Sequence, residues 1–202
     1  MIPYFTGSAG MDVLQVIRAH YEPGTPLYAL LLDHSRRVRD KALAVARAMA
    51  HLAPDMLFID QAAMLHDIGI GATAANRIHC HGTLPYVCHG VVGGRLLNAC
   101  GLTRHALVCE RHVGVGLSRD DIVKHNLPLP PRDMLPVTLE EAIVCYADKF
   151  YSKNRPDREL TPNEILSELG PFGHDRIERF RQWHFQFTGE RLEATLITKA
   201  PE

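Results

Sequence analysis

The sequence has no excess of charge of either sign. Lys and Arg total 22 against 23 for Asp and Glu, so the formal net charge of the 202 residues is −1. Proteins that bind nucleic acid along its backbone present a strongly basic surface, and this balance therefore argues against broad nucleic-acid binding. A nucleotide held locally is not excluded by it.

No segment has the pattern of a membrane span or a signal peptide. The longest run without acidic or basic residues, 78–94, contains three histidines and a proline, which make it a poor membrane helix. The start of the chain, Met1 to Gly7, lacks the basic residues and apolar core of a signal peptide. We therefore expect a cytoplasmic protein without a membrane partner.

The cysteines are odd in number and contain no Cys-x-x-Cys pair. This pattern argues against a disulfide framework and against a zinc ribbon. It favours reduced cysteines that pack as small core residues. The five are Cys80, Cys88, Cys100, Cys109 and Cys145.

Strand-like alternation is scarce, apart from a weak stretch at 194–198, whereas helix-start signals recur. Thr25-Pro26 can open a long helix, and the segments that begin at Ser118, Thr138 and Thr161 have the spacing of a capping box. Thr103 can cap a further helix. The sequence therefore predicts an all-α fold with helices at 11–21, 26–51, 55–67, 85–100, 103–113, 118–124, 138–153, 162–169 and 174–187. The proline-rich region 126–137 is expected to be a loop, and the length suits one domain.

Polar residues lie on the apolar faces of the second and third predicted helices. His34 falls on the same helical stripe as Leu31 and Val38. His66 falls on the apolar face of the next helix, and Asp67 follows it directly. These side chains are expected to point inward.

Three later segments repeat this feature. His89 shares a face with apolar residues at i+3, i+4, i+7 and i+8, and His112 follows Cys109 by three residues. Asp148 follows Val144 by four residues, so it also faces the apolar side. Five helices thus each direct a histidine or a carboxylate toward the interior.

One inward histidine is usually a hydrogen-bonded core residue, but two inward aspartates need another explanation. A buried carboxylate is very costly unless it is paired or bound to a metal. Helical periodicity places no lysine or arginine near Asp67 on the inward face of its helix. A shared cation accounts for all these groups, and imidazole with carboxylate suits Fe, Mn, Co, Ni or Zn.

The motif Met64-Leu65-His66-Asp67-Ile68-Gly69, with His34 upstream and Asp148-Lys149 downstream, resembles the HD-domain superfamily of metal-dependent phosphohydrolases. It is most similar to the branch that reads His-Asp-Ile-Gly. The resemblance covers roughly residues 28 to 153. It implies a single-domain helical bundle over 1–202, with a core at about 26–153 on which helices 162–187 pack.

The resemblance also implies the ligands and the reaction. His34, His66, Asp67 and Asp148 would bind metal, and members with two ions add two histidines, for which His89 and His112 are suitably placed. Asp67 would bridge the two ions and, with His66, form the catalytic pair. A water activated by the ions would then cleave a small phosphorylated substrate, such as a phosphate ester or a nucleotide.

Four further residues are candidates for substrate binding. Lys149 follows the last aspartate, as in many HD proteins, although its helical phase also suits a surface lysine. His79 and His81 lie in a loop that could cover the site or simply face solvent. Arg37 lies one turn after His34 and could line the mouth of a pocket.

Several alternatives stay open. The chain lacks the Gly-Tyr-Pro signature and the lysine soon after His-Asp that are usual in the branch that cleaves cyclic dinucleotides. Relatives with the same ligands hold two irons and oxidise C–H bonds, and others are sensors without turnover. An aromatic stripe in 174–187 packs either on the core or across a homodimer interface.

Overall fold

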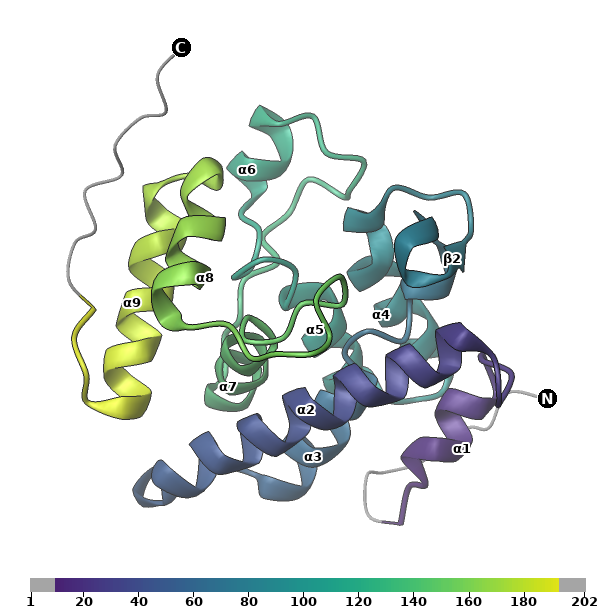
Figure 1. Cartoon of the computed structure of the whole chain (residues 1–202), viewed down its shortest axis with the longest axis horizontal. Coiled ribbons are helices and arrows are strands. Elements are labelled where there is room, and N and C mark those ends of the chain that lie inside the picture. Colours follow the sequence, from purple (N-terminus) through teal and green to yellow (C-terminus); the bar gives the residue numbers. More distant parts are fainter. Residues whose placement is uncertain (1–9, 193–202) are drawn as a thin grey trace.

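The computed structural model describes residues 10–192, and this part of the chain is almost entirely helical (Figure 1). The predicted strand-like stretch 194–198 and the start of the chain, 1–7, lie outside the described residues. The α-helices are α1 (Val13–Arg18), α2 (Pro26–Ala48), α3 (Met56–Leu65), α4 (His89–Ala99), α5 (Thr103–Arg111), α6 (Arg119–Lys124), α7 (Leu139–Asp148), α8 (Pro162–Leu169) and α9 (His174–Thr188). The predicted all-α fold class is confirmed.

The long helix α2 organises the fold. It begins where predicted, because Oγ1 of Thr25 accepts a hydrogen bond from the backbone of Tyr28 and Pro26 occupies the first turn. Its apolar stripe packs against α3 and α7, and α4 and α5 pack on each other beside them (Figure 1). Within residues 10–192 no helix is both long enough and apolar enough to cross a bilayer.

Two apolar clusters meet at α3 and α5. The first lies between α2, α7 and the C-terminal helices and includes Ala62 and Val108. The second lies under α1 and α4 and includes Leu65 and Cys109. Both clusters therefore reach the carboxyl ends of α3 and α5, where the inward polar residues lie. All five cysteines are buried and unpaired, as expected.

The C-terminal helices lie against the first cluster. α9 contacts α2, α7 and α8. Its Phe180 is fully buried and stacks on Tyr146 of α7, with ring centroids 5.4 Å apart. The aromatic stripe on α9 thus packs on the core.

Three helices are shorter at the site than the sequence predicts. α3 ends at Leu65 instead of 67, α4 begins at His89 after a 3-10 turn (Tyr86–Cys88), and α7 ends at Asp148 instead of 153. Beyond Asp148 the backbone closes i→i−3 hydrogen bonds at 149, 150 and 151 and then turns away. Helical periodicity therefore could not place the side chains that follow α7.

A short hairpin was missed by the sequence analysis. β1 (Ala74–Ala75) pairs antiparallel with β2 (Cys80–His81), with Ala74 opposite His81. Two-residue strands are too short to produce a visible alternation of apolar and polar residues. The expected loop around the histidines is therefore partly a β-hairpin.

The capping signals had mixed outcomes. Ser118 and Thr161 form complete capping boxes. Thr138 caps α7, but Glu141 instead binds Arg111 and the backbone of Val137. The expected cap at Thr103 was wrong, because Leu102 occupies the N-cap position there.

Candidate metal centre

The six predicted ligands converge in one buried place. They come from the middle of α2, the ends of α3, α5 and α7, and the start of α4. Their side-chain atoms form two groups in which all potential ligand atoms lie within 4.8 Å of one another. The groups are His34, His66, Asp67 and Asp148, and Asp67, His89 and His112.

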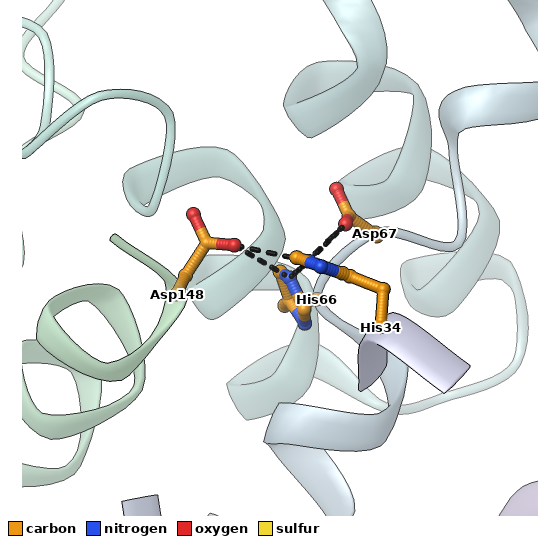
Figure 2. A group of neighbouring side chains, drawn as sticks. All are labelled: His34, His66, Asp67 and Asp148. Atoms are coloured by element: carbon orange, nitrogen blue, oxygen red, sulfur yellow. Dashed lines mark hydrogen bonds and ion pairs between the residues drawn. The ribbon is translucent and has the colours of Figure 1, made fainter. Parts of the chain in front are cut away.

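Figure 2 shows the first group, in which two imidazoles and two carboxylates face one another. Nε2 of His34 lies 3.1 Å from Oδ2 of Asp67 and 3.1 Å from Oδ1 of Asp148. Nε2 of His66 lies 3.1 Å and 3.4 Å from the same two oxygens. Two imidazoles and two carboxylates therefore surround a common point.

The second group uses the other oxygen of Asp67. Oδ1 lies 3.4 Å from Nε2 of His89 and 3.5 Å from Nε2 of His112. The two imidazole nitrogens are 3.0 Å apart. Each oxygen of Asp67 thus faces a different histidine pair, so this carboxylate joins the two groups.

Backbone carbonyls set the tautomer of three of these histidines. Nδ1 of His66 donates to the carbonyl of Ala63 at 2.7 Å. His89 and His112 repeat this i→i−3 hydrogen bond, to Tyr86 and Cys109, at 2.6 Å and 2.8 Å. With the proton on Nδ1, a neutral imidazole presents the lone pair of Nε2 to the centre, as a metal ligand requires.

This arrangement fits metal ions. The Nε2 atoms of His89 and His112 are both acceptors in these tautomers, and two facing acceptors 3.0 Å apart need a cation between them. Oδ1 of Asp67 is buried and has no hydrogen-bond partner among the described residues, because the lysine that pairs with this carboxylate uses Oδ2; a buried anionic oxygen of this kind is costly unless a cation is bound. The two adjacent clusters could therefore hold metal ions.

The electrostatics support anionic carboxylates. Burial raises the pKa of Asp67, but Lys153 and His66 outweigh burial and hold the pKa well below its usual range. Burial likewise opposes protonation of His66, yet Asp67 and Asp148 raise its pKa to about 9, so its imidazole must release the proton on Nε2 when that atom binds a metal. Burial lowers the pKa of His89 to about 3. Burial also raises the pKa of Asp148, but Lys149 and His34 outweigh burial and hold it well below its usual range, so both carboxylates are ionised at neutral pH.

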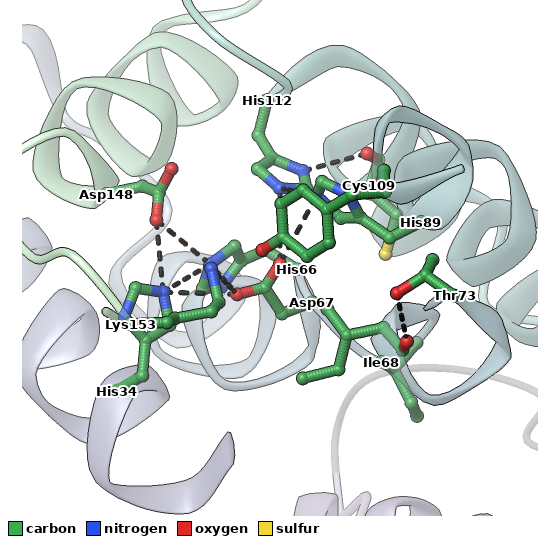
Figure 3. A network of polar contacts seen from close by, with 12 residues as sticks. His34, His66, Asp67, Ile68, Thr73, His89, Cys109, His112, Asp148 and Lys153 are labelled. Carbon is green, nitrogen blue, oxygen red and sulfur yellow. Dashed lines mark hydrogen bonds and ion pairs between the residues drawn. The ribbon is translucent and has the colours of Figure 1, made fainter. Parts of the chain in front are cut away.

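Lys153 was missed by the sequence analysis. Its ammonium lies 2.5 Å from Oδ2 of Asp67, and only 10% of its side chain is exposed (Figure 3). In the predicted helix 138–153 this residue would lie on a different face from Asp148 and would point away from the site. In the structure α7 ends at Asp148, and the chain then turns back over the site. No local sequence signal marks that turn.

Of the four residues predicted to bind substrate, only Lys149 contacts one of the candidate metal ligands directly. Lys149 is largely buried, and its ammonium lies 2.8 Å from Oδ2 of Asp148. Arg37 lines a smaller cavity of about 280 Å³ beside His34, where it pairs with Asp33. His79 and His81 are exposed on the hairpin, and neither lines this cavity or the larger one described next.

A cavity of about 780 Å³ opens from the metal centre. His89, His112 and Asp148 of the centre are among its lining residues. Its walls continue along the loop after α7 and reach α8 and the start of α9. Lys153 lines both this cavity and the smaller one, so its ammonium lies where the two approach the centre.

Comparison with known proteins places this chain in a family. No protein-family model matches the chain. The uncharacterized protein MJ0778 of Methanocaldococcus jannaschii is 36% identical over 153 residues, and the match covers 74% of this chain and 82% of that protein. The chain belongs to the family of MJ0778. The helical fold and its buried His/Asp clusters confirm the resemblance to the HD-domain superfamily.

Two other relatives are named tRNA (cytidine(56)-2'-O)-methyltransferases. The protein of Thermoplasma volcanium is 30% identical over 156 residues, and that of Picrophilus torridus is 34% identical over 143 residues. The matches cover 76% and 69% of this chain but only 40% and 37% of those proteins. The chain therefore spans about two fifths of their length.

Among solved structures, the HD domain of the phosphodiesterase PgpH of L. monocytogenes, in complex with cyclic-di-AMP, is similar. The TM-score is 0.48 and the sequence identity 15%, over 90% of this chain and 99% of that chain.

Proposed function

We propose that this chain is a metal-dependent phosphohydrolase that cleaves a phosphate ester or anhydride with a water molecule. The observation that carries the proposal is the division of Asp67 between two histidine pairs. A carboxylate in this position can bridge two ions, and two-ion sites favour in-line displacement at phosphorus.

His34, His66 and Asp148 would hold one ion, His89 and His112 the other, and Asp67 both. Divalent ions held there would lower the pKa of a water molecule and polarise the phosphoryl group. Mn, Fe, Co, Ni and Zn all suit these ligands.

The surrounding residues would bind and orient the phosphate. The ammonium of Lys153 lies beside Asp67 and the residue lines both cavities, so it can hold a phosphoryl oxygen at the centre. Lys149 pairs with the outer oxygen of Asp148 and keeps the inner oxygen turned toward His34. The apolar clusters beneath exclude water from the ligands.

Methyl transfer is not part of this proposal. The relatives that carry that name extend well beyond the matched segment, and four histidines with two carboxylates are a ligand set for metal ions. An oxygenase with two irons uses the same kind of ligands, so the two lysines at the cavity are the feature that favours a phosphate substrate.

Metal analysis and a substrate screen test the proposal together. The purified protein is loaded with Mn, Fe, Co, Ni or Zn and assayed on phosphomonoesters, nucleotides and phosphodiesters, with oxygen uptake measured in parallel. Turnover of a phosphate compound is expected. A fully metallated sample that cleaves none of them, or that instead consumes oxygen with an organic substrate, overturns the proposal.

The number of ions is tested by single substitutions. Two ions per chain are expected, and His89→Ala and His112→Ala should each lose one. His105→Gln is the matched control, because His105 is also a buried histidine of α5 but lies outside the centre. Equal metal content in all three variants would exclude the second ion.

A further inference from the structure

The larger cavity continues beyond the metal centre, and the surface that faces it is mainly apolar. This apolar lining begins beside the second histidine pair. Val113 lines the cavity and directly follows His112 in the chain. Val87 also lines it and lies two residues before His89. The apolar part of the cavity is therefore continuous with the place where the phosphate would lie.

The apolar residues that line the rest of the cavity belong to two clusters. Ile165 and Leu169, on α8, are part of the first cluster. Leu117 and Leu127 belong to a third cluster, which lies around α6. Phe172, in the turn before α9, lines the cavity as well and is 58% exposed. Apolar side chains from two parts of the core thus face one cavity.

The charged residues of α8 and α9 that line this part are paired within the protein. Arg176 binds the carbonyl of Phe172 at 3.1 Å and Oδ1 of Asp121 at 3.3 Å. Its Nε is fully buried and therefore not open to the cavity. Glu168 forms an ion pair with Arg155. The charges at this end are therefore already balanced by protein groups.

Two further basic residues, Arg77 and His125, also line the cavity. Arg77 lies in the short turn Asn76–Ile78 and His125 directly after α6, and both are exposed. Because they are exposed, they line the part of the cavity that is open to solvent. A ligand with a second anionic group would have to reach them there, so a bisphosphate is the competing probe.

We propose that the apolar part of the cavity holds a hydrocarbon tail, so that the substrate is the phosphate ester of an apolar alcohol. The phosphate lies at the metal centre and the tail lies against Leu127, Leu169 and Phe172. Burial of a hydrocarbon stabilises the complex without hydrogen bonds, whereas a sugar would lose hydrogen bonds to water that apolar walls do not replace. The volume of about 780 Å³ suits a whole organic ligand. This inference rests on the proposed function and names its substrate class.

Equilibrium binding to the metal-loaded protein tests the tail site without turnover. The probes are butyl, hexyl and octyl phosphate below their micellar concentrations, with inorganic phosphate, ribose 5-phosphate, adenosine monophosphate and octanediol bisphosphate for comparison. Affinity should rise about two- to fourfold with each added methylene group, as its burial predicts, and inorganic phosphate should displace each ester. An affinity that does not rise with tail length, or tighter binding of the bisphosphate or the nucleotide than of octyl phosphate, overturns the inference.

Substitution of the exposed ring tests its contact with the tail. Phe172→Ala should weaken octyl phosphate binding about fivefold or more and leave inorganic phosphate binding unchanged. Phe172→Leu should bind octyl phosphate as the unchanged protein does, because an apolar contact is needed and a planar ring is not. Phe185→Ala is the control, since Phe185 is an exposed aromatic of α9 that does not line the cavity.

The outcomes distinguish the two proposals. If inorganic phosphate binds but affinity does not rise with tail length, or if Phe172→Ala and Phe185→Ala behave alike, the tail site is wrong and the phosphohydrolase proposal stands. Octyl phosphate that binds without being displaced by inorganic phosphate also overturns the tail site. If no phosphate compound binds the metal-loaded protein, the phosphohydrolase proposal fails, and the tail site fails with it.

Discussion

Gly69 lies directly against the backbone of His89. A Cβ atom at Gly69 would be 2.1 Å from the carbonyl oxygen of His89 and 2.4 Å from the backbone nitrogen of Gly93. The φ angle of Gly69 is −89°, which any residue can adopt, so the requirement for glycine here is steric. This contact sets how closely the loop after Asp67 approaches α4.

Gly69→Ala is expected to separate that loop from α4. The overlapping atoms belong to the backbone and cannot rotate away, so we expect a loss of about 3 kcal/mol or more in the free energy of unfolding. Gly71→Ala is expected to cost less, because its Cβ would meet only the side chain of Tyr21, at 3.0 Å, and no backbone atom. Thermal unfolding and metal content measure both effects. Unchanged metal content in Gly69→Ala would contradict this role of the contact.

Tyr21 holds the same loop from the other side. Its hydroxyl donates to the carbonyl of Ile68 at 2.6 Å and accepts from the backbone nitrogen of Gly71 at 3.0 Å. Tyr21→Phe leaves both backbone groups unpaired in a buried site, and should cost about 1–3 kcal/mol of stability and weaken metal binding. Chelator competition measures the latter. Tyr28→Phe, at a half-buried position on α2, should change neither quantity.

Lys153→Met tests the role of the ammonium beside Asp67. The substitution keeps the length of the side chain and removes its charge. We expect metal content to be retained, and kcat/KM for phosphate substrates to fall by about a hundredfold as a charge-assisted contact is lost. Phosphate should also bind more weakly in a calorimeter. Lys124→Met, on the exposed face of α6, is the control; equal kinetics in both variants would exclude Lys153 from the reaction.

His105 should make the protein acid-sensitive. Burial lowers its pKa to about 4, whereas an unfolded histidine titrates near 6.5. As the pH falls from 6.5 toward 4, the unfolded chain takes up a proton that folded His105 does not, so stability is lost over that range, by roughly 2–3 kcal/mol. His105→Gln can still contact Gln61 and should reduce this loss. Urea unfolding at pH 7.5 and 4.5 checks it; identical pH dependence in both proteins would refute it.

The helices and their inward faces could be predicted from the sequence because the signals are local. A cap such as Thr25 acts within one turn, and the apolar stripe that contains His34 repeats every turn of the same helix. The metal motif could be recognised for a similar reason, since each ligand lies on such a stripe or directly after one. No assembled structure is needed to see these features.

Positions outside regular helices could not be predicted in this way. Lys153 reaches Asp67 because α7 ends five residues earlier and the chain then folds back. His79 and His81 lie near the motif in sequence, yet the hairpin turns them toward solvent. In each case the direction of a side chain depends on packing between segments far apart in the chain.

The sequence by itself determined the helical class and the candidate ligands. It also showed that two buried carboxylates among these ligands require a cation. Only the tertiary structure decided that the two oxygens of Asp67 face different histidine pairs, and that a cavity joins them to Arg176 on α9. The physical reason is that periodicity defines which face of a helix is buried, whereas the distances between faces follow from how side chains of different helices pack together.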